Sequence, residues 1–485
     1  MDLTNVSFRK TLSNERWAEG EFLEYRSRVL DRWPTGDEIR DVEDCVSYSR
    51  GLDASQCFPK LLREARNQGV PLFQVGIGHT TISEQRDHMT QAVSEGVDLI
   101  LTLTDTYTRK SSYDRAADGI ARALKGPDTR VLNGFPIVNY GLETRELFRS
   151  AGVPIHISGN VDEEAMLSSE MGYAAGASCD FTHSLHDLVQ HSRDYPLVQR
   201  IQNNQYVSRL AAHYTEGGAP IELIALANYQ GLVPPGLGIA VAILSMLSSV
   251  AQGAKYISLH RCIEGSLEQD VAAFHAYRRV ADHYLALFEH EDVDCVTHSW
   301  PWMGAWPEPD FENAALVSWC AAVSMLAGVD WIYLKSIHEG SGIPDVHSNL
   351  ASIQLARELR RIIPPQAMSD VDAIAVESQF IEEEAHNLID AALNLGDGDP
   401  NLGQVLAVKE GYLDIPMASW NGVADSVVAV RDVRGAVRYL NPGKLPLSMS
   451  VLEHHRLKVE ERKRDDALEG DIALVIHDIR QYMNG

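Results

Sequence analysis

Eight short apolar segments, separated by segments with helical periodicity, constrain the fold of this chain more than any other feature. Each has the length of a strand and is rich in β-branched residues. They span residues 72–77, 98–104, 131–139, 153–159, 221–227, 256–260, 293–298 and 331–334. Uninterrupted apolar runs that alternate with helices are typical of parallel strands buried on both faces.

The helical segments between these runs are regular enough to act as crossovers. They include residues 81–95, 116–124, 142–151, 197–214, 237–251, 267–288 and 312–327. Eight such repeats predict an α/β protein with a (β/α)8 barrel. A doubly wound open sheet uses the same alternation and is the alternative architecture. Residues 159–219 are long for one crossover, so we expect an excursion over the barrel mouth there.

The two ends of the chain depart from this alternation. We therefore predict three parts: an N-terminal helical segment at 1–60, a (β/α)8 catalytic domain at 61–365 and a C-terminal α+β extension at 366–485. In the extension, residues 371–395 have the pattern of an amphipathic helix and residues 427–440 that of a hairpin, followed by two helices.

Composition narrows the classes of partner. The 485 residues include 42 basic and 68 acidic side chains, a net charge of −26, which argues against nucleic acid or an anionic membrane as a partner. The six cysteines form no CxxC pair or metal-ligand pattern, so we expect free thiols and a cytoplasmic location. No segment has the pattern of a leader or of a membrane span, so we expect neither.

Residues near the carboxyl ends of the predicted strands are the candidates for chemistry, because a barrel of this kind places its active site there. They are Gly76, Gly78, Arg109, Asn133, Ser158, Asp180, His260, Arg261, Trp306, Lys335 and Glu339. The chain contains no Gly-x-Ser-x-Gly elbow, no HExxH and no P-loop. Three common enzyme classes therefore lack support from motifs.

Several candidates have simpler alternatives. Arg109 has the donor geometry to bind a carboxylate, but it could instead pair with Asp114 on the surface. Lys335 and Glu339 are four residues apart, so they could form an ordinary ion pair on a helical turn. Asp180 could cap the following helix. The nearby histidines at 183, 186 and 191 match no common zinc spacing, so we predict no metal site.

Four motifs taken together connect the chain to a known family. The chain resembles the epsilon subunits of the glutamate mutase (methylaspartate mutase) family, which are adenosylcobalamin-dependent carbon-skeleton isomerases. The likeness runs in order from Trp33 to Leu440. The motifs are Asp105-Thr-Tyr-Thr-Arg109, Asn133-Gly-Phe-Pro136, Trp302-Met-Gly-Ala-Trp306-Pro307 and Lys335-Ser-Ile-His-Glu339.

The resemblance implies a barrel fold, an isomerase activity and a radical mechanism. It implies that Arg109 binds the carboxylate of the substrate, and that Lys335 and Glu339 hold the ribose of the coenzyme's adenosyl group. Further positions that would line the coenzyme are Gly78, Asn133, Trp306 and Ile343.

The substrate pocket departs from the family pattern. Gly76 and Ser158 stand where the family has two further substrate-binding arginines, and Asp180 replaces a glutamate that contacts the substrate's amino group. His186 and Gln190 replace tyrosines that contact the substrate. Losing two charge-assisted donors, at roughly 1.5 to 3 kcal/mol each, would weaken glutamate binding strongly.

Other side chains could compensate for this loss. Arg261 and His260 follow the sixth predicted strand, and His79 and His156 lie near the vacated positions, so these residues could rebuild an anion pocket of another shape. We therefore expect glutamate to be a poor substrate and a related amino or 2-oxo acid to be the better one.

The coenzyme requires a partner. Cobalamin mutases that bind the corrin themselves carry a DxHxxG motif, and the nearest stretch here, Asp345 to Leu350, lacks the final glycine. We therefore expect a small partner subunit with that motif to hold the corrin, and we expect a homodimeric core of barrels. The alternative functions are a degenerate, non-catalytic barrel that binds a ligand or partner and, less favoured, a cobalamin-independent lyase.

Overall fold

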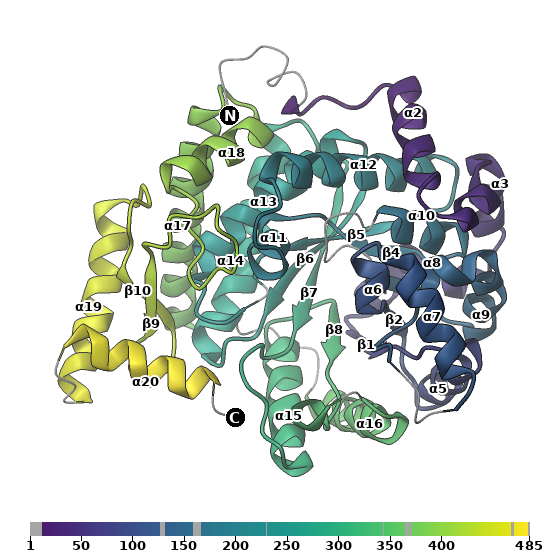
Figure 1. Cartoon of the computed structure of the whole chain (residues 1–485). Helices are drawn as coiled ribbons and strands as arrows, with labels where there is room; N and C mark the ends of the chain where they lie inside the picture. The colour runs from purple at the N-terminus through teal and green to yellow at the C-terminus, as the bar shows by residue number, and fades with distance from the viewer. Residues whose placement is uncertain are drawn as a thin grey trace.

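Eight parallel strands close into a barrel at the centre of the molecule (Figure 1). The computed structural model describes residues 12–126, 131–158, 166–228, 230–342, 344–363, 368, 371–466 and 470–483. Each strand pairs with the next in sequence order, and β8 pairs with β1. The strands are β1 (Leu72–Ile77), β2 (Leu99–Leu103), β3 (Ile155–Ser158), β4 (Cys179–Phe181), β5 (Glu222–Leu226), β6 (Tyr256–Cys262), β7 (Asp294–Trp300) and β8 (Trp331–Leu334). The predicted (β/α)8 class is confirmed.

Helices surround the barrel in the order expected from the crossovers (Figure 1). All seven predicted crossover helices are present, with ends within a few residues of the expected ones. The helices are α5 (Ile82–Ser94), α6 (Thr106–Arg109), α7 (Tyr113–Ala123), α8 (Ile137–Tyr140), α9 (Thr144–Ala151), α10 (Met166–Ala174), α11 (Leu185–His191), α12 (Leu197–Glu216), α13 (Pro235–Ala251), α14 (Leu267–Leu287), α15 (Asp310–Leu326) and α16 (Val346–Ile362).

One predicted strand was wrong and one real strand was missed. Residues 131–139 make only a single bridge, between Thr104 and Phe135, and then enter α8. Pro136 has no N–H to donate to a ladder and α8 begins at Ile137, so no strand extends here. The true fourth strand, β4, lies inside the segment predicted as an excursion and has only three residues, Cys-Asp-Phe, without β-branching.

The two chain ends pack outside the barrel. The N-terminal part consists of α2 (Glu19–Leu30), η1 (Pro34–Ile39), α3 (Val42–Arg50), η2 (Ala54–Gln56) and α4 (Phe58–Asn67). Phe58 contacts Trp331 edge-on at 4.9 Å and covers the amino end of the barrel. No described helix combines the length and the apolar character needed to cross a membrane.

The C-terminal extension lies on the opposite side of the barrel from α2 and α3 (Figure 1). It contains α17 (Asp372–Leu395), α18 (Pro400–Glu410), the hairpin β9 (Val428–Arg431) and β10 (Val437–Asn441), α19 (Met449–Asp465) and α20 (Asp471–Met483). The predicted amphipathic helix, hairpin and pair of tail helices are therefore confirmed. Helix α17 packs against α13 and α14, which attaches the extension to the barrel.

Side chains inside the barrel stack in aromatic pairs. His298 and Trp331 stack at 3.4 Å between ring centroids, and Trp300 and Tyr333 stack at 3.9 Å. These four residues come from the neighbouring strands β7 and β8, where alternate side chains point inward. The interior is therefore a packed aromatic core beneath the strand ends.

Glu222 is an acid buried inside this core. Ser258 Oγ donates to its Oε1 at 2.7 Å, and Trp331 Nε1 donates to that hydroxyl at 3.0 Å. Burial raises the pKa of Glu222 to about 8, so the folded protein holds its proton at neutral pH.

Glu222→Gln tests this protonation. Because the unfolded chain releases the proton near pH 4.5, wild-type stability should fall between about pH 4.5 and pH 8, by at most about 1.4 kcal/mol per pH unit from this group. The neutral variant should escape that loss, so its melting temperature relative to wild type should rise across this window. Exposed Glu291→Gln serves as control. Parallel melting-temperature curves for wild type and Glu222→Gln would contradict the assignment.

Candidate active site

The predicted site residues come from many separate segments, and the parallel barrel brings their backbones to one rim. Gly76 and Ser158 lie at the ends of β1 and β3, and Lys335 directly follows β8. Arg109 ends α6, the turn after β2. Ile343 lies outside the described residues. The rim therefore carries the candidates, but their side chains do not all face the same way.

Lys335 and Glu339 meet at the rim. Lys335 Nζ lies 2.8 Å from Glu339 Oε1, and the two side chains are 13% and 27% exposed, so the pair is sheltered but reachable. The ammonium also lies 5.2 Å from the ring centroid of Trp306, which is a cation–π contact. Trp306 Nε1 donates to the Trp302 carbonyl at 3.1 Å, which fixes the indole. An ammonium, a carboxylate and an aromatic face thus lie side by side.

Arg109 is held in place by a different loop. Asp105 caps α6 by accepting from the backbone N–H groups of Tyr107 and Thr108, at 2.9 and 3.1 Å. This capping sets the short helix that carries Arg109. Arg109 Nη2 donates to Thr106 Oγ1 at 3.1 Å, and the same hydroxyl lies 3.1 Å from Asn133 Oδ1. Thr106 therefore links Arg109, the predicted carboxylate-binding residue, to Asn133, a residue predicted to line the coenzyme.

The Arg109 guanidinium has spare donors. It forms no ion pair with a carboxylate in the part of the chain that the structure describes, so the alternative pairing with Asp114 does not occur there. Its Nε is buried and without a hydrogen-bond partner among the same residues. The Asp105 carboxylate interacts with it electrostatically but is bonded to the start of α6. A half-buried guanidinium with a free donor can bind an anion.

Gly76 is fitted to Tyr333. A Cβ on Gly76 would lie only 2.5 Å from the Tyr333 hydroxyl oxygen and 3.1 Å from Leu103 Cδ1. The tyrosine ring is fixed by its stacking on Trp300, and the Gly76 carbonyl accepts from Asn349 Nδ2 at 3.0 Å. The Tyr333 hydroxyl therefore occupies the space in which a side chain at position 76 would begin.

Three imidazoles lie deeper in the barrel. His260 and His298 have ring centroids 5.1 Å apart, and His156 contacts Phe181 at 4.6 Å. All three are fully buried. His156 Nε2 and both ring nitrogens of His260 and His298 lack a hydrogen-bond partner among the described residues. Burial lowers the pKa of His260 to about 3 and the pKa values of the other two well below the usual range, so all three are neutral at pH 7.

Asp180 and Arg261 turn away from the interior. Asp180 Oδ2 accepts from the hydroxyls of Ser169 and Tyr173 on α10, at 2.7 and 3.1 Å, and burial raises its pKa to about 7. Arg261 Nη2 lies 3.5 Å from Asp270 Oδ1 on α14. Their strand neighbours face the interior instead, as alternation requires. Both side chains point into the helix layer, and their predicted contacts with a substrate stay untested predictions.

The remaining predicted residues lie around the mouth. His186 on α11 is fully buried and electrostatically coupled to His260, whereas Gln190 on the same helix is partly exposed. His79 Nε2 lies 2.8 Å from His88 Nδ1, so His79 belongs to a histidine pair outside the barrel interior. No group of three or more His, Cys, Asp or Glu among the described residues could hold a metal ion.

Tyr482, which is not among the predicted site residues, also contributes to the rim. Tyr482 of α20 accepts from Gly231 N–H at 2.7 Å and donates to the Met303 carbonyl at 2.6 Å, and its own carbonyl accepts from Ala305 N–H at 2.8 Å. It therefore ties the loops after β5 and β7 to the C-terminal helix. No local signal identifies a tyrosine almost 180 residues away from the loop that it holds.

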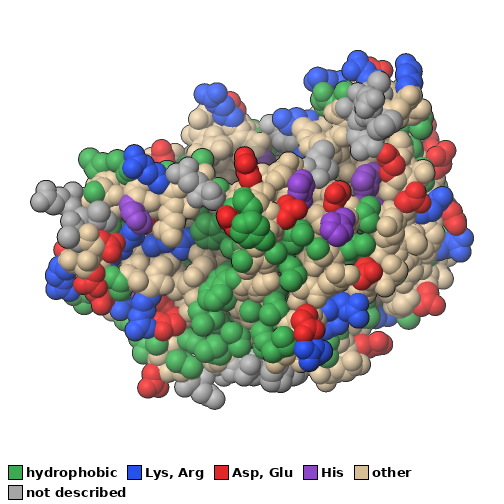
Figure 2. Space-filling view, turned by 90° about the horizontal axis from the view of Figure 1, so that it is seen from below, with side chains coloured by type: hydrophobic (Ala, Val, Ile, Leu, Met, Phe, Trp, Pro, Cys, Tyr) green, Lys and Arg blue, Asp and Glu red, His purple; other side chains and the backbone are tan. Residues whose placement is uncertain are grey.

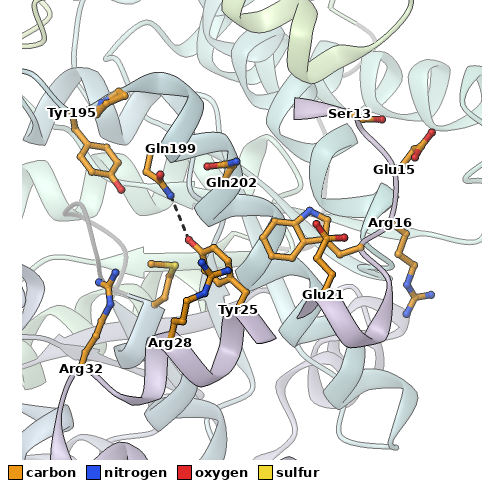
Figure 3. A pocket seen from close by; sticks show the side chains of 13 residues that line it. Ser13, Glu15, Arg16, Glu21, Tyr25, Arg28, Arg32, Tyr195, Gln199 and Gln202 are labelled. Atoms are coloured by element: carbon orange, nitrogen blue, oxygen red, sulfur yellow. Dashed lines mark hydrogen bonds between the residues drawn. The ribbon is translucent and has the colours of Figure 1, made fainter. Parts of the chain in front are cut away.

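A separate cavity of about 870 Å³ lies between α2 and the start of α12 (Figure 3). Arg28, Arg32 and Glu21 line it, and Gln199 Nε2 donates to the Tyr25 hydroxyl across it at 3.4 Å. None of the predicted site residues lines this cavity. It is therefore distinct from the strand-end site.

A double-mutant cycle tests the fit between Gly76 and Tyr333. Gly76→Ala should cost about 1–3 kcal/mol of unfolding free energy through overpacking. In the Tyr333→Phe background the same change should cost at least about 0.5 kcal/mol less, because the obstructing oxygen is gone. Gly78→Ala, whose Cβ would meet Leu103 Cβ at 2.9 Å instead, should cost the same in both backgrounds. Additive costs for Gly76→Ala and Tyr333→Phe would refute this fit.

Tyr482→Phe tests how the C-terminal helix holds the rim. Removing the hydroxyl leaves the Gly231 amide and the Met303 carbonyl unpaired, at a cost of roughly 1–3 kcal/mol. Hydrogen exchange should then accelerate at Gly231 and in residues 302–306. Tyr48→Phe, which removes a 3.2 Å bond to the Arg145 carbonyl, is the control and should leave those amides protected. Unchanged exchange in Tyr482→Phe would contradict the proposed tie.

Comparisons with known proteins identify the family of the chain. A family model described as Methylaspartate mutase E chain (MutE) matches residues 52–485. The glutamate mutase epsilon subunit of Desulfitobacterium hafniense (strain Y51) is 32% identical over 472 residues, which cover 96% of this chain and 97% of the relative. The epsilon subunit of Escherichia coli O157:H7 is 30% identical over 470 residues, covering 96% and 97%. The chain therefore belongs to the methylaspartate mutase E chain family.

Proposed function

We propose that this chain is the catalytic, epsilon-like subunit of an adenosylcobalamin-dependent carbon-skeleton mutase of the glutamate mutase type. It would be an intramolecular transferase that acts on L-glutamate or on a related amino or 2-oxo acid. Membership of the mutase family supports isomerase activity in general. The observation that carries the finer proposal is the contact of Lys335 with both Glu339 and Trp306 at the barrel rim.

The described residues fit the adenosyl part of such a coenzyme. Lys335 offers N–H donors and Glu339 offers acceptor oxygens, which together complement the two hydroxyls of a ribose. Trp306 offers a face on which a base can stack, Gly78 directly follows β1, and Asn133 bonds Thr106 in the turn after β2. The bound coenzyme would supply the radical chemistry of the rearrangement.

The chain's own groups would bind, orient and shelter the substrate. Arg109 would hold one carboxylate through its free donors. The packed barrel beneath the rim would exclude water and keep the reacting carbon atoms in register. The buried pair of Ser258 and Glu222 inside the barrel would not act as nucleophile and base, because Glu222 keeps its proton at neutral pH, which suits a reaction without such a step.

A second subunit would hold the corrin. The stretch nearest to a corrin-binding motif serves the fold instead, because Asp345 and Ser348 form a capping box at the start of α16 and Asn349 binds the Gly76 carbonyl. The relatives are named as epsilon subunits, which supports an assembly with further subunits. We propose a small partner with a DxHxxG motif, and a cytoplasmic location that suits the six free thiols.

The apolar face of α20 supports a further subunit contact. Ile472, Ile476, Ile479 and Met483 are spaced along one side of this helix and are exposed. Figure 2 views the molecule from below, the side on which α15 and α20 lie in Figure 1. It shows hydrophobic side chains gathered on this side of the molecule. Such exposure is typical of interfaces, so the proposed homodimeric core has a surface available to it.

Reconstitution tests the proposed function. The full chain, a small cobalamin subunit from an epsilon-family mutase and adenosylcobalamin should give a substrate-dependent, cobalt-coupled radical signal in electron paramagnetic resonance. L-Glutamate and a panel of amino and 2-oxo acids serve as substrates. Coenzyme binding without any signal would favour the alternative, a non-catalytic barrel.

Substitutions at the rim test the roles of the ion pair. Lys335→Met and Glu339→Gln should each raise the concentration of coenzyme needed for half-maximal activity about 10- to 100-fold, the equivalent of one charge-assisted hydrogen bond. Substrate affinity should change far less. Lys255→Met, which removes a surface ion pair with Asp292, is the matched control. Equal losses for coenzyme and substrate would contradict the assigned roles.

A further inference from the structure

The wall beneath the rim is polar and aromatic but carries no net positive charge in its described part. It contains the neutral imidazoles of His156, His260 and His298 and the stacked rings of Trp300 and Tyr333. His156 Nδ1 lies 3.0 Å from Gln74 Nε2, which is another uncharged group. The unpartnered ring nitrogens are buried donors and acceptors that a ligand could satisfy.

Of the three predicted cations of the site, two are already paired with a carboxylate. Lys335 pairs with Glu339, and Arg261 faces the helix layer, where Asp270 and Glu264 are its electrostatic partners. Arg109 interacts electrostatically with Asp105 but forms no ion pair with a described carboxylate. Of these three cations only Arg109 is left to match a carboxylate, and a second carboxylate would meet none of them.

Two further rim positions supply no second cation. At position 76 the Tyr333 hydroxyl takes the place of a side chain. At position 158 the side chain is a short hydroxyl, buried to 9% exposure. A second carboxylate entering the barrel would meet neutral hydrogen-bonding groups and rings, and burying it there would cost its hydration without an ion pair in return.

We propose that the site takes an amino acid or 2-oxo acid with a single carboxylate and an uncharged side group, held by Arg109 at one end and by the imidazole and aromatic wall at the other. The inference rests on the proposed mutase function and narrows its substrate class. It replaces the expectation that the histidines rebuild an anion pocket, because uncharged imidazoles in a dry interior are hydrogen-bonding groups and not cations.

Ligand binding to the reconstituted complex tests the inference without any substitution. Isothermal titration calorimetry would compare L-glutamate with four amino acids whose side chains are uncharged (the uncharged probes). These are L-glutamine, L-methionine, L-phenylalanine and L-tyrosine. L-Glutamine matches L-glutamate in shape and differs in charge. At least one uncharged probe should bind 10-fold or more tightly than L-glutamate. L-Glutamate binding as tightly as the best uncharged probe, or more tightly, would overturn the inference.

The radical signal from the same samples separates this inference from the proposed function. Tight binding of an uncharged probe without a radical from any acid would leave the substrate class intact and refute the mutase. A radical with L-glutamate, together with its tighter binding, would uphold the mutase and refute the substrate class.

A matched pair of variants tests charge directly. Ser158→Arg adds a guanidinium at the rim, and Ser158→Gln adds a neutral side chain of intermediate length. The ratio of L-glutamate to L-glutamine affinity should rise at least 10-fold in the arginine variant relative to the glutamine variant. An equal ratio in two variants that fold with wild-type circular dichroism would show that missing positive charge does not set selectivity.

Discussion

Closure of β8 onto β1 is the constraint on which the site depends. The two strands pair in parallel with Gln74 opposite Tyr333 and Val75 opposite Leu334. This register places Gly76 beside the Tyr333 hydroxyl and brings Lys335 to the same rim as Gly78. In an open sheet these residues would lie at opposite edges, so the candidate site exists only because the sheet closes.

Burial gives the interior its chemical character. A buried imidazole or carboxyl group keeps its neutral form because the charged form loses its hydration. His260 and Glu222 illustrate the two directions, since burial lowers one pKa to about 3 and raises the other to about 8. The wall beneath the rim is consequently polar without being charged, and the rim supplies the charged groups. This division suits a reaction that needs orientation and shelter more than strong acids or bases.

The sequence predicted the architecture well because the long crossover helices and most strands have strong periodic patterns. The prediction failed where the local sequence pattern was weak. Strand β4 has three residues without β-branching, and the apolar segment at 131–139 is cut short by Pro136 and by the start of α8. Strand alternation in turn explains why Asp180 and Arg261 face the helix layer, which a spacing argument along the chain does not reveal. The fit of Gly76 to Tyr333 joins residues more than 250 positions apart, and only the closed barrel makes it visible.

Hydrogen transfer between coenzyme and substrate tests the central claim most directly. Adenosylcobalamin deuterated at the 5′ carbon would be incubated with the reconstituted complex and the acid that binds most tightly, and the acid would be examined by mass spectrometry. We expect deuterium to enter that acid in the wild-type protein, and the transfer to fall sharply in Lys335→Met. Coenzyme bound at the rim with no label passing to any acid would contradict a catalytic role for this barrel.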